Sequence, residues 1–158
     1  MAWSRANKDA LLRLAIGLKI SENHLRDLMD WLEEVALRDR IEIHDVLARK
    51  AVADIESDPR LGRADKLKRI KEQVRRLRFP RLAQTEDALR SRIHELKLHP
   101  EITLSLPPGL EGGRLQVQFS ASTEDEFKRL SAKLAQILDR DSVREIFRLL
   151  AGRATENG

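Results

Sequence analysis

Residue types that commonly carry catalysis or metal binding are present in this sequence but are not spaced for either task. The four histidines, His24, His44, His94 and His99, form no H-E-x-x-H pair, and there is no cysteine to act as a thiolate ligand or nucleophile. No local motif places a serine or threonine beside a base. The sequence therefore predicts no catalytic residue, no metal site and no cofactor, and it favours a protein that is not an enzyme.

Acidic pairs and glycines also lack a catalytic arrangement. Glu33–Glu34 and the pair Asp139 and Asp141 fall on charged helix surfaces or at helix starts, where carboxylates favour solubility or the helix dipole. The glycines of residues 107–113 follow prolines in a predicted hairpin loop, and no G-x-x-x-x-G-K-[ST] phosphate loop occurs. These patterns indicate structural roles.

Lysine and arginine are concentrated in one window of the chain. Residues 60–81 carry ten of them against two acids, for a net charge of +8, whereas residues 1–59 and 82–158 carry −3 and −1. A row of cations on a helix neutralises phosphates and releases their counterions, which gives salt-sensitive binding without sequence readout. The candidate nucleic-acid-binding residues are the seven cations of its compact central run: Lys66, Lys68, Arg69, Lys71, Arg75, Arg76 and Arg78.

Two other interpretations of this window stay open. The cations form a solvated helix face that pairs in part with the acidic second helix, or they dock on an acidic protein partner and make the chain an interaction adaptor or scaffold. A membrane-surface helix is disfavoured because the apolar stripe of the window lacks the Trp or Phe anchors typical of such helices. The predicted partner is nucleic acid, with DNA favoured, or an acidic protein, and not a membrane.

Length and composition limit the fold and the compartment. The chain has 158 residues, of which 41% are hydrophobic, 35% charged and only 4% aromatic, so an aliphatic core is expected and base-stacking platforms are not. No apolar stretch approaches the roughly 18 residues of a membrane span, and charges stand where a signal-peptide core would begin. Together with the absence of cysteine, this predicts a cytoplasmic protein.

Apolar residues recur with the helical period over the first 80 residues. Leu11, Leu12, Ala15 and Ile16 mark one face of a first helix over residues 4–17. Ser21 is placed to cap a second, acidic helix, and Pro59 ends a third helical segment. A fourth helix over residues 63–79 carries the basic window. Residues 1–80 are therefore predicted to form a helical domain.

The period changes to two after residue 98. Ile102, Leu104 and Leu106, and later Leu115, Val117 and Phe119, alternate with polar residues around a loop of prolines and glycines, which predicts an antiparallel hairpin. Capping boxes at Thr123–Glu126 and Ser142–Glu145 predict two closing helices, the first bearing Phe127 and the second Phe147. The expected fold is mainly α with one β-hairpin (α+β), in which residues 81–152 form an α-β-β-α domain and residues 153–158 a flexible tail.

The region of residues 85–138 resembles a known family. The order of a helix, the segment Ile102-Thr103-Leu104, the strand Gly113-Arg114-Leu115-Gln116-Val117-Gln118-Phe119 and the helix beginning Thr123-Glu124-Asp125-Glu126 is similar to the C-terminal domain of ParB chromosome-partitioning proteins. The resemblance implies a homodimer formed through strand pairing, and sequence-independent DNA binding. The strand positions that carry lysines in that family hold Thr103, Ser105, Gln116 and Gln118 here, so any DNA contact is expected at residues 66–78 instead.

An isolated two-stranded sheet is marginally stable in water, so the hairpin must be covered by helices or joined by strands from a second copy. Exposed strand edges make the second arrangement physically easy. We therefore expect a homodimer through the hairpin.

Overall fold

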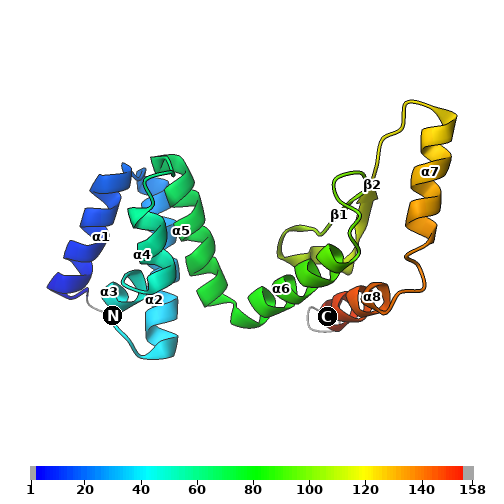
Figure 1. Cartoon of the computed structure of the whole chain (residues 1–158). Helices are drawn as coiled ribbons and strands as arrows, with labels where there is room; N and C mark the ends of the chain where they lie inside the picture. The colour runs from blue at the N-terminus through cyan, green and yellow to red at the C-terminus, as the bar shows by residue number, and fades with distance from the viewer. Residues whose placement is uncertain (1–2, 155–158) are drawn as a thin grey trace. The chain divides into compact units, whose positions relative to one another are not determined.

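The chain forms two compact units, Met1–Pro80 and Arg81–Gly158, in a computed structural model that describes residues 3–154. The first unit is built of helices alone, as Figure 1 shows. The second unit combines helices with one antiparallel hairpin, so the predicted fold class, mainly α with one hairpin, is confirmed. No helix of residues 3–154 has the length and apolar character needed to cross a membrane.

The first unit packs its helices around an aliphatic core. Leu28, Leu32 and Val35 of the second helix are fully buried in this core, together with Ile70 and Val74 of the fifth. The helices of the unit are α1 (Arg5–Leu18), α2 (Glu22–Asp39), α3 (Ile43–Leu47), α4 (Lys50–Ser57) and α5 (Arg63–Arg78).

A buried asparagine joins α1 to α3. The Asn7 amide donates to Glu42 Oε2 at 2.7 Å, and its carbonyl oxygen accepts from the His44 backbone N–H at 3.0 Å. Asn7 is 1% exposed, and these bonds satisfy its polar atoms. The α1 helix therefore turns its Asn7, Leu11, Leu14 and Leu18 inward.

This orientation corrects two expectations about α1. Leu12 and Ile16, predicted to lie on the buried face, are 57% and 68% exposed. The helix also continues through Gly17, and the residue in the left-handed conformation that ends it is Lys19, at φ 51°. The apolar residues of α1 therefore cover a wider face of the helix than the face that packs into the core of the first unit.

The second unit carries the hairpin. Its strands β1 (Thr103–Ser105) and β2 (Gln116–Gln118) pair antiparallel, with Leu104 opposite Val117. The connection contains the turn η1 (Pro108–Gly113), in which Gly109, Leu110 and Gly112 all have positive φ. Buried Leu110 anchors this loop in a core shared with Leu89, Ile102, Leu130 and Ile146.

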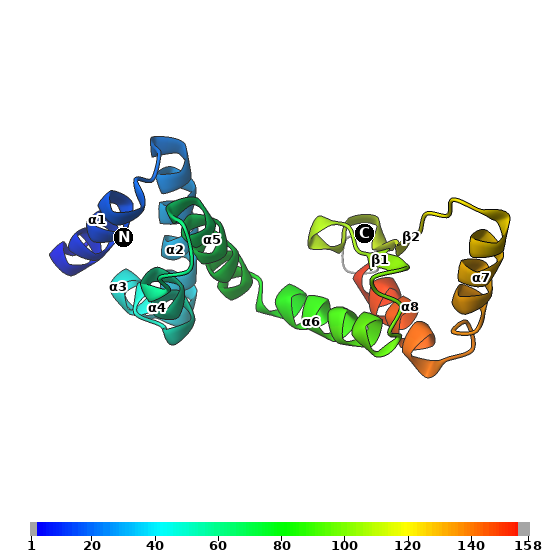
Figure 2. The ribbon, with the colours of Figure 1, turned by 45° about the horizontal axis from the view of Figure 1, so that its top comes forward.

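Three helices complete the second unit, as Figures 1 and 2 show: α6 (Pro80–Glu95), α7 (Glu124–Ala135) and α8 (Asp141–Ala154). The Thr123 side chain caps α7 by accepting from Glu126 N–H at 3.1 Å, as predicted. The second capping box is wrong, because α8 already begins at Asp141 and the Ser142 hydroxyl donates to Glu95 instead, at 2.8 Å.

Phe127 of α7 and Phe147 of α8 are 57% and 53% exposed. One further expectation, about the C-terminal tail, changes. The predicted tail, residues 153–158, is helical at positions 153 and 154, and positions 155–158 lie outside the described residues.

An ion-pair cluster links α7 to the start of the hairpin. Glu101 accepts from Lys133 Nζ at 2.7 Å and from the Arg129 guanidinium, and both donors lie on α7. Hydrogen bonds from Lys133 and then Arg129 lower the pKa of Glu101 from 4.5 to about 2. A carboxylate with a depressed pKa stabilises the folded state above its unfolded pKa and loses that contribution as the pH falls through the folded one.

We therefore expect the attachment of α7 to weaken as the pH falls from about 4.5 to about 2. A carboxyl-carbon NMR titration should give Glu101 a midpoint near pH 2. Lys133→Gln should move this midpoint to higher pH, because it removes the cationic donor that lowers the Glu101 pKa most. A midpoint near 4.5 in the unsubstituted protein would contradict the cluster.

Candidate nucleic-acid interface

The basic helix α5 lies beside α2 and α4, as the two views of the ribbon show. Its apolar residues Ile70 and Val74 are fully buried, and Leu67 and Leu77 pack at the edge of the same core. Because successive helical residues are turned by about 100°, this inward row determines where each cation of α5 points. The seven candidate cations therefore divide into flanking groups that meet the neighbouring helices and an outer group.

Two cations on one flank of α5 are bound to α2. Lys71 Nζ lies 3.0 Å from Asp27 Oδ2, and the Arg78 guanidinium donates to Glu34 with an Nη2–Oε1 distance of 2.8 Å. Both cations also lie over the ring of Trp31, 5.0 Å and 5.8 Å from its centroid. Their side chains are only 19% and 28% exposed, so they act mainly in holding α5 on α2.

One cation on the opposite flank reaches α4. Lys66 Nζ donates to the backbone carbonyl of Glu56 at 2.7 Å, near the C-terminal end of that helix. A cation in this position satisfies a carbonyl that has no partner within the helix and interacts favourably with the helix dipole. Lys66 is half-buried there and ties α5 to its second neighbour.

The outer face of α5 holds the remaining four candidates, Lys68, Arg69, Arg75 and Arg76. Arg75 is 26% exposed and makes a paired contact with Glu72, through two hydrogen bonds of 2.8 Å. Arg76 is half-buried on the same face. Lys68 and Arg69 are exposed, and within the described residues neither side chain has a hydrogen-bond or ion-pair partner. The outer face thus presents four cations around one central carboxylate.

Sequence reasoning missed the part played by Trp31. Asp27, Trp31 and Glu34 are spaced four and three residues apart, so they line one face of α2, and a Trp between two acids indicates a surface that receives cations. That signal was available in the sequence. The Glu56 carbonyl, in contrast, could not be identified, because a backbone acceptor has no sequence signature.

The other residues considered for chemistry do not gather into a site. Within residues 3–154 no three histidine or acidic side chains are grouped to hold a metal ion. His44 is engaged in the α1–α3 contact, with Nδ1 3.0 Å from Asn7 Oδ1, and His24 Nδ1 lies 3.2 Å from Lys71 Nζ. The outer face of α5 is therefore the best-supported candidate site.

Comparison with known proteins gives no relative to transfer a function from: no family model, no curated protein and no solved structure matches the chain.

The division of the α5 cations into inner and outer groups can be tested by the free energy of unfolding of the first unit. Both tryptophans, Trp3 and Trp31, lie in this unit, so their fluorescence reports its unfolding alone. Lys71→Met should destabilise this unit by about 1 kcal/mol, since it removes an ion pair and a cation–π contact. The matched substitution Lys68→Met should change the free energy of unfolding by less than about 0.5 kcal/mol. Urea unfolding followed by tryptophan fluorescence makes the comparison, and equal effects would contradict the division.

Proposed function

We propose that this protein is a non-catalytic, DNA-associated accessory protein that binds duplex DNA through phosphate contacts on the outer face of α5. The observation that carries the proposal is that the Lys68 and Arg69 side chains are exposed and make no hydrogen bond or ion pair in the described structure, on a helix that its other cations hold in place. Because the helix is already ordered, phosphate binding does not carry the additional cost of ordering the backbone. The proposed location is the cytoplasm.

Phosphate contacts of this kind carry no sequence information. Cations on a surface neutralise phosphates and release counterions, and the logarithm of the affinity then falls linearly with the logarithm of the salt concentration. Four outer cations contacting four phosphates predict a slope of roughly −3.6. Glu72 opposes this binding, because it lies among the four cations and pairs with Arg75.

The chemistry of the outer face favours DNA over an acidic protein. Protein interfaces usually have an apolar or aromatic centre. The large apolar residues of α5, Leu67, Ile70, Val74 and Leu77, are all buried or half-buried in the core of the first unit. An outer face with cations and no large exposed apolar side chain suits a sugar–phosphate backbone better than a folded partner.

We propose further that the second unit self-associates through its hairpin. The two strands β1 and β2 form a sheet with no other strand in the described part of the chain, which leaves an outer edge on each strand. Val117 is 41% exposed on β2, although it lies in the centre of the strand pairing. The resemblance of residues 85–138 to the ParB C-terminal domain implies the same association. A dimer carries two copies of α5 and strengthens DNA binding by multivalency.

Charge reversal tests the DNA proposal. Lys68→Glu combined with Arg69→Glu should weaken binding to a labelled random-sequence duplex at least tenfold and make the salt slope shallower by about 2, because two phosphate contacts are lost. Fluorescence anisotropy at several salt concentrations measures both quantities. Glu72→Gln should strengthen binding, since it removes the carboxylate that competes with phosphate for Arg75.

The matched control is Lys97→Glu combined with Arg140→Glu, two exposed positions of the second unit outside the hairpin strands that alter the net charge equally. This control should keep the salt slope of the unsubstituted protein. Unchanged DNA affinity in the Lys68 and Arg69 variant would contradict the proposal. Tighter binding to polyglutamate than to duplex DNA would assign the face to an acidic protein partner instead.

Sedimentation across a range of protein concentrations tests self-association. Val117→Glu should shift the equilibrium toward monomer, because it places a charge at the proposed strand interface, while its exposed position leaves the fold of the monomer intact. Leu37→Glu, at a site 68% exposed in the first unit, is the control and should not change the mass. A monomeric unsubstituted protein at all concentrations would disprove the dimer.

A further inference from the structure

An exposed aromatic ring lies just beyond the C-terminal end of α5. Phe79 directly follows the last residue of the helix and is 44% exposed. Lys68, Glu72, Arg75 and Phe79 follow one another at spacings of four, three and four residues, which places them in one row on a helix. Phe79 extends this row because its backbone N–H still donates to the Arg75 carbonyl, at 3.0 Å. The row that holds cations of the proposed DNA interface therefore ends at an aromatic side chain.

The ring of Phe79 is held by contacts inside the first unit. The Arg78 guanidinium lies over it, with Cζ 4.9 Å from the ring centroid, and the same Cζ lies 5.8 Å from the centroid of Trp31. This guanidinium is itself fixed by its ion pair with Glu34. The Arg38 side chain donates to the Arg78 backbone carbonyl at 3.0 Å and so holds the end of the helix. A ligand that stacks on the exposed part of the ring therefore has little further ordering to impose.

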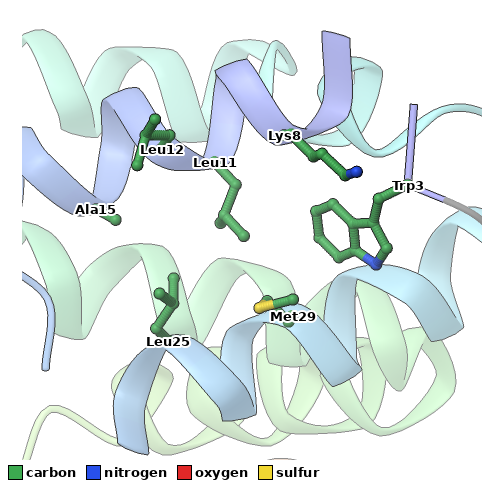
Figure 3. Close-up of a pocket in the computed structure, with 7 residues that line it drawn as sticks. All are labelled: Trp3, Lys8, Leu11, Leu12, Ala15, Leu25 and Met29. Atoms are coloured by element: carbon green, nitrogen blue, oxygen red, sulfur yellow. The ribbon is translucent and has the colours of Figure 1, made fainter. Parts of the chain in front are cut away.

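The other aromatic side chains of the first unit, Trp3 and Trp31, are not placed for the same task. Trp31 is covered by the two cations of α5 described above. Trp3 lines an apolar groove between α1 and α2, which Figure 3 shows, and its indole N–H donates to the Glu33 carboxylate. A carboxylate beside the ring repels an approaching phosphate. Phe79 is therefore the aromatic residue of this unit that combines exposure with neighbouring cations.

The position of Phe79 relative to the outer cations favours a particular form of DNA. A base offers its ring face for stacking where it is unpaired, because the bases inside a duplex already stack on one another. Lys68 precedes Phe79 by eleven residues, or about 16 Å along the helix, which is the length of about five stacked nucleotides at roughly 3.4 Å each. The outer cations can thus contact phosphates of paired DNA while Phe79 contacts a base at its end.

We propose that Phe79 stacks on the first unpaired base at a junction between duplex and single-stranded DNA, an inference that rests on the proposed DNA-binding function. Lys68 and Arg69 contact phosphates of the duplex, and the unpaired base lies against the part of the Phe79 ring that Arg78 does not cover. Because every base has a ring face, the preference is for the structure of the DNA and not for its sequence. The aromatic content of 4% predicted no base-stacking platform, but a single base needs only one ring placed beside cations.

Three labelled DNA probes test the proposal on the full chain. They share one duplex, which is blunt in the first probe, carries a thymidine extension in the second and carries an extension of abasic residues in the third. The abasic extension keeps every phosphate and removes the bases, so it separates stacking from charge. Fluorescence anisotropy should show that the thymidine probe binds about tenfold more tightly than the abasic probe.

Substitutions of Phe79 make the test specific. Phe79→Ala should weaken the thymidine probe about tenfold and leave the blunt and abasic probes unchanged, because only the stacked base is lost. Phe79→Trp should keep the preference for the thymidine probe, since it retains an aromatic ring. Phe147→Ala is the matched control, because it removes a phenylalanine of the second unit that is 53% exposed, and it should change no affinity. Circular dichroism should show an unaltered fold in each variant, since both positions are exposed.

A photocrosslink locates the unpaired base directly. An iodinated deoxyuridine at the first position of the extension should crosslink to Phe79 on irradiation, which mass spectrometry of the digested complex detects. A crosslink to Phe119, Phe127 or Phe147 of the second unit, with none to Phe79, would overturn the inference.

Equal affinity for the thymidine and abasic probes would also overturn it, and so would a Phe79→Ala variant that binds every probe as the unsubstituted protein does. An equal loss of affinity for the blunt duplex would overturn it as well, because Phe79 would then contact paired DNA. In each of these cases the blunt duplex is still bound, so the proposed phosphate contacts on α5 stand. Failure to bind any of the three probes would instead overturn the proposed function together with this inference.

Discussion

The packing of the α5 apolar row into the core of the first unit is the constraint on which the charge distribution of this protein depends. Ile70 and Val74 are fully buried, so α5 has no freedom to rotate. The cations that flank this apolar row contact α2 or α4, and the cations on the opposite face of α5 point away from the core of the unit. One helix therefore supplies both the contacts that hold the first unit together and the charges that remain for a partner.

The contacts around Trp31 show how a basic helix is held on an acidic one. Lys71 and Arg78 each combine a carboxylate with the face of the Trp31 ring, and their aliphatic stems cover the ring in a partly buried setting. Such contacts are stronger than exposed ion pairs, because fewer waters screen them. The first unit still keeps a net charge of +4, and the second has none, so the positive field of the chain arises from the first.

Periodicity was enough to predict the fold class and the hairpin, although the single helical segment expected before Pro59 is two helices, α3 and α4. Alternation around Leu104 and Val117 gave the strands, and the prolines at positions 59 and 80 fall at the helix boundaries expected of them. It did not predict which cations are paired, because Lys68 and Lys71 look alike in sequence and differ only through the position of Asp27 on a neighbouring helix. Nor did it predict the exposure of Leu12 and Ile16, since an exposed apolar residue on a helix can follow the same sequence pattern as one in the core.

Side-chain NMR of the lysine and arginine nitrogens during titration with duplex DNA tests the central claim most directly, because each cation of α5 is observed separately. The account predicts that the Lys68 Nζ and Arg69 Nε resonances shift, and that those of Lys71 and Arg78 stay in place against Asp27 and Glu34. Shifts at Lys71 and Arg78 with none at Lys68 and Arg69 would contradict it.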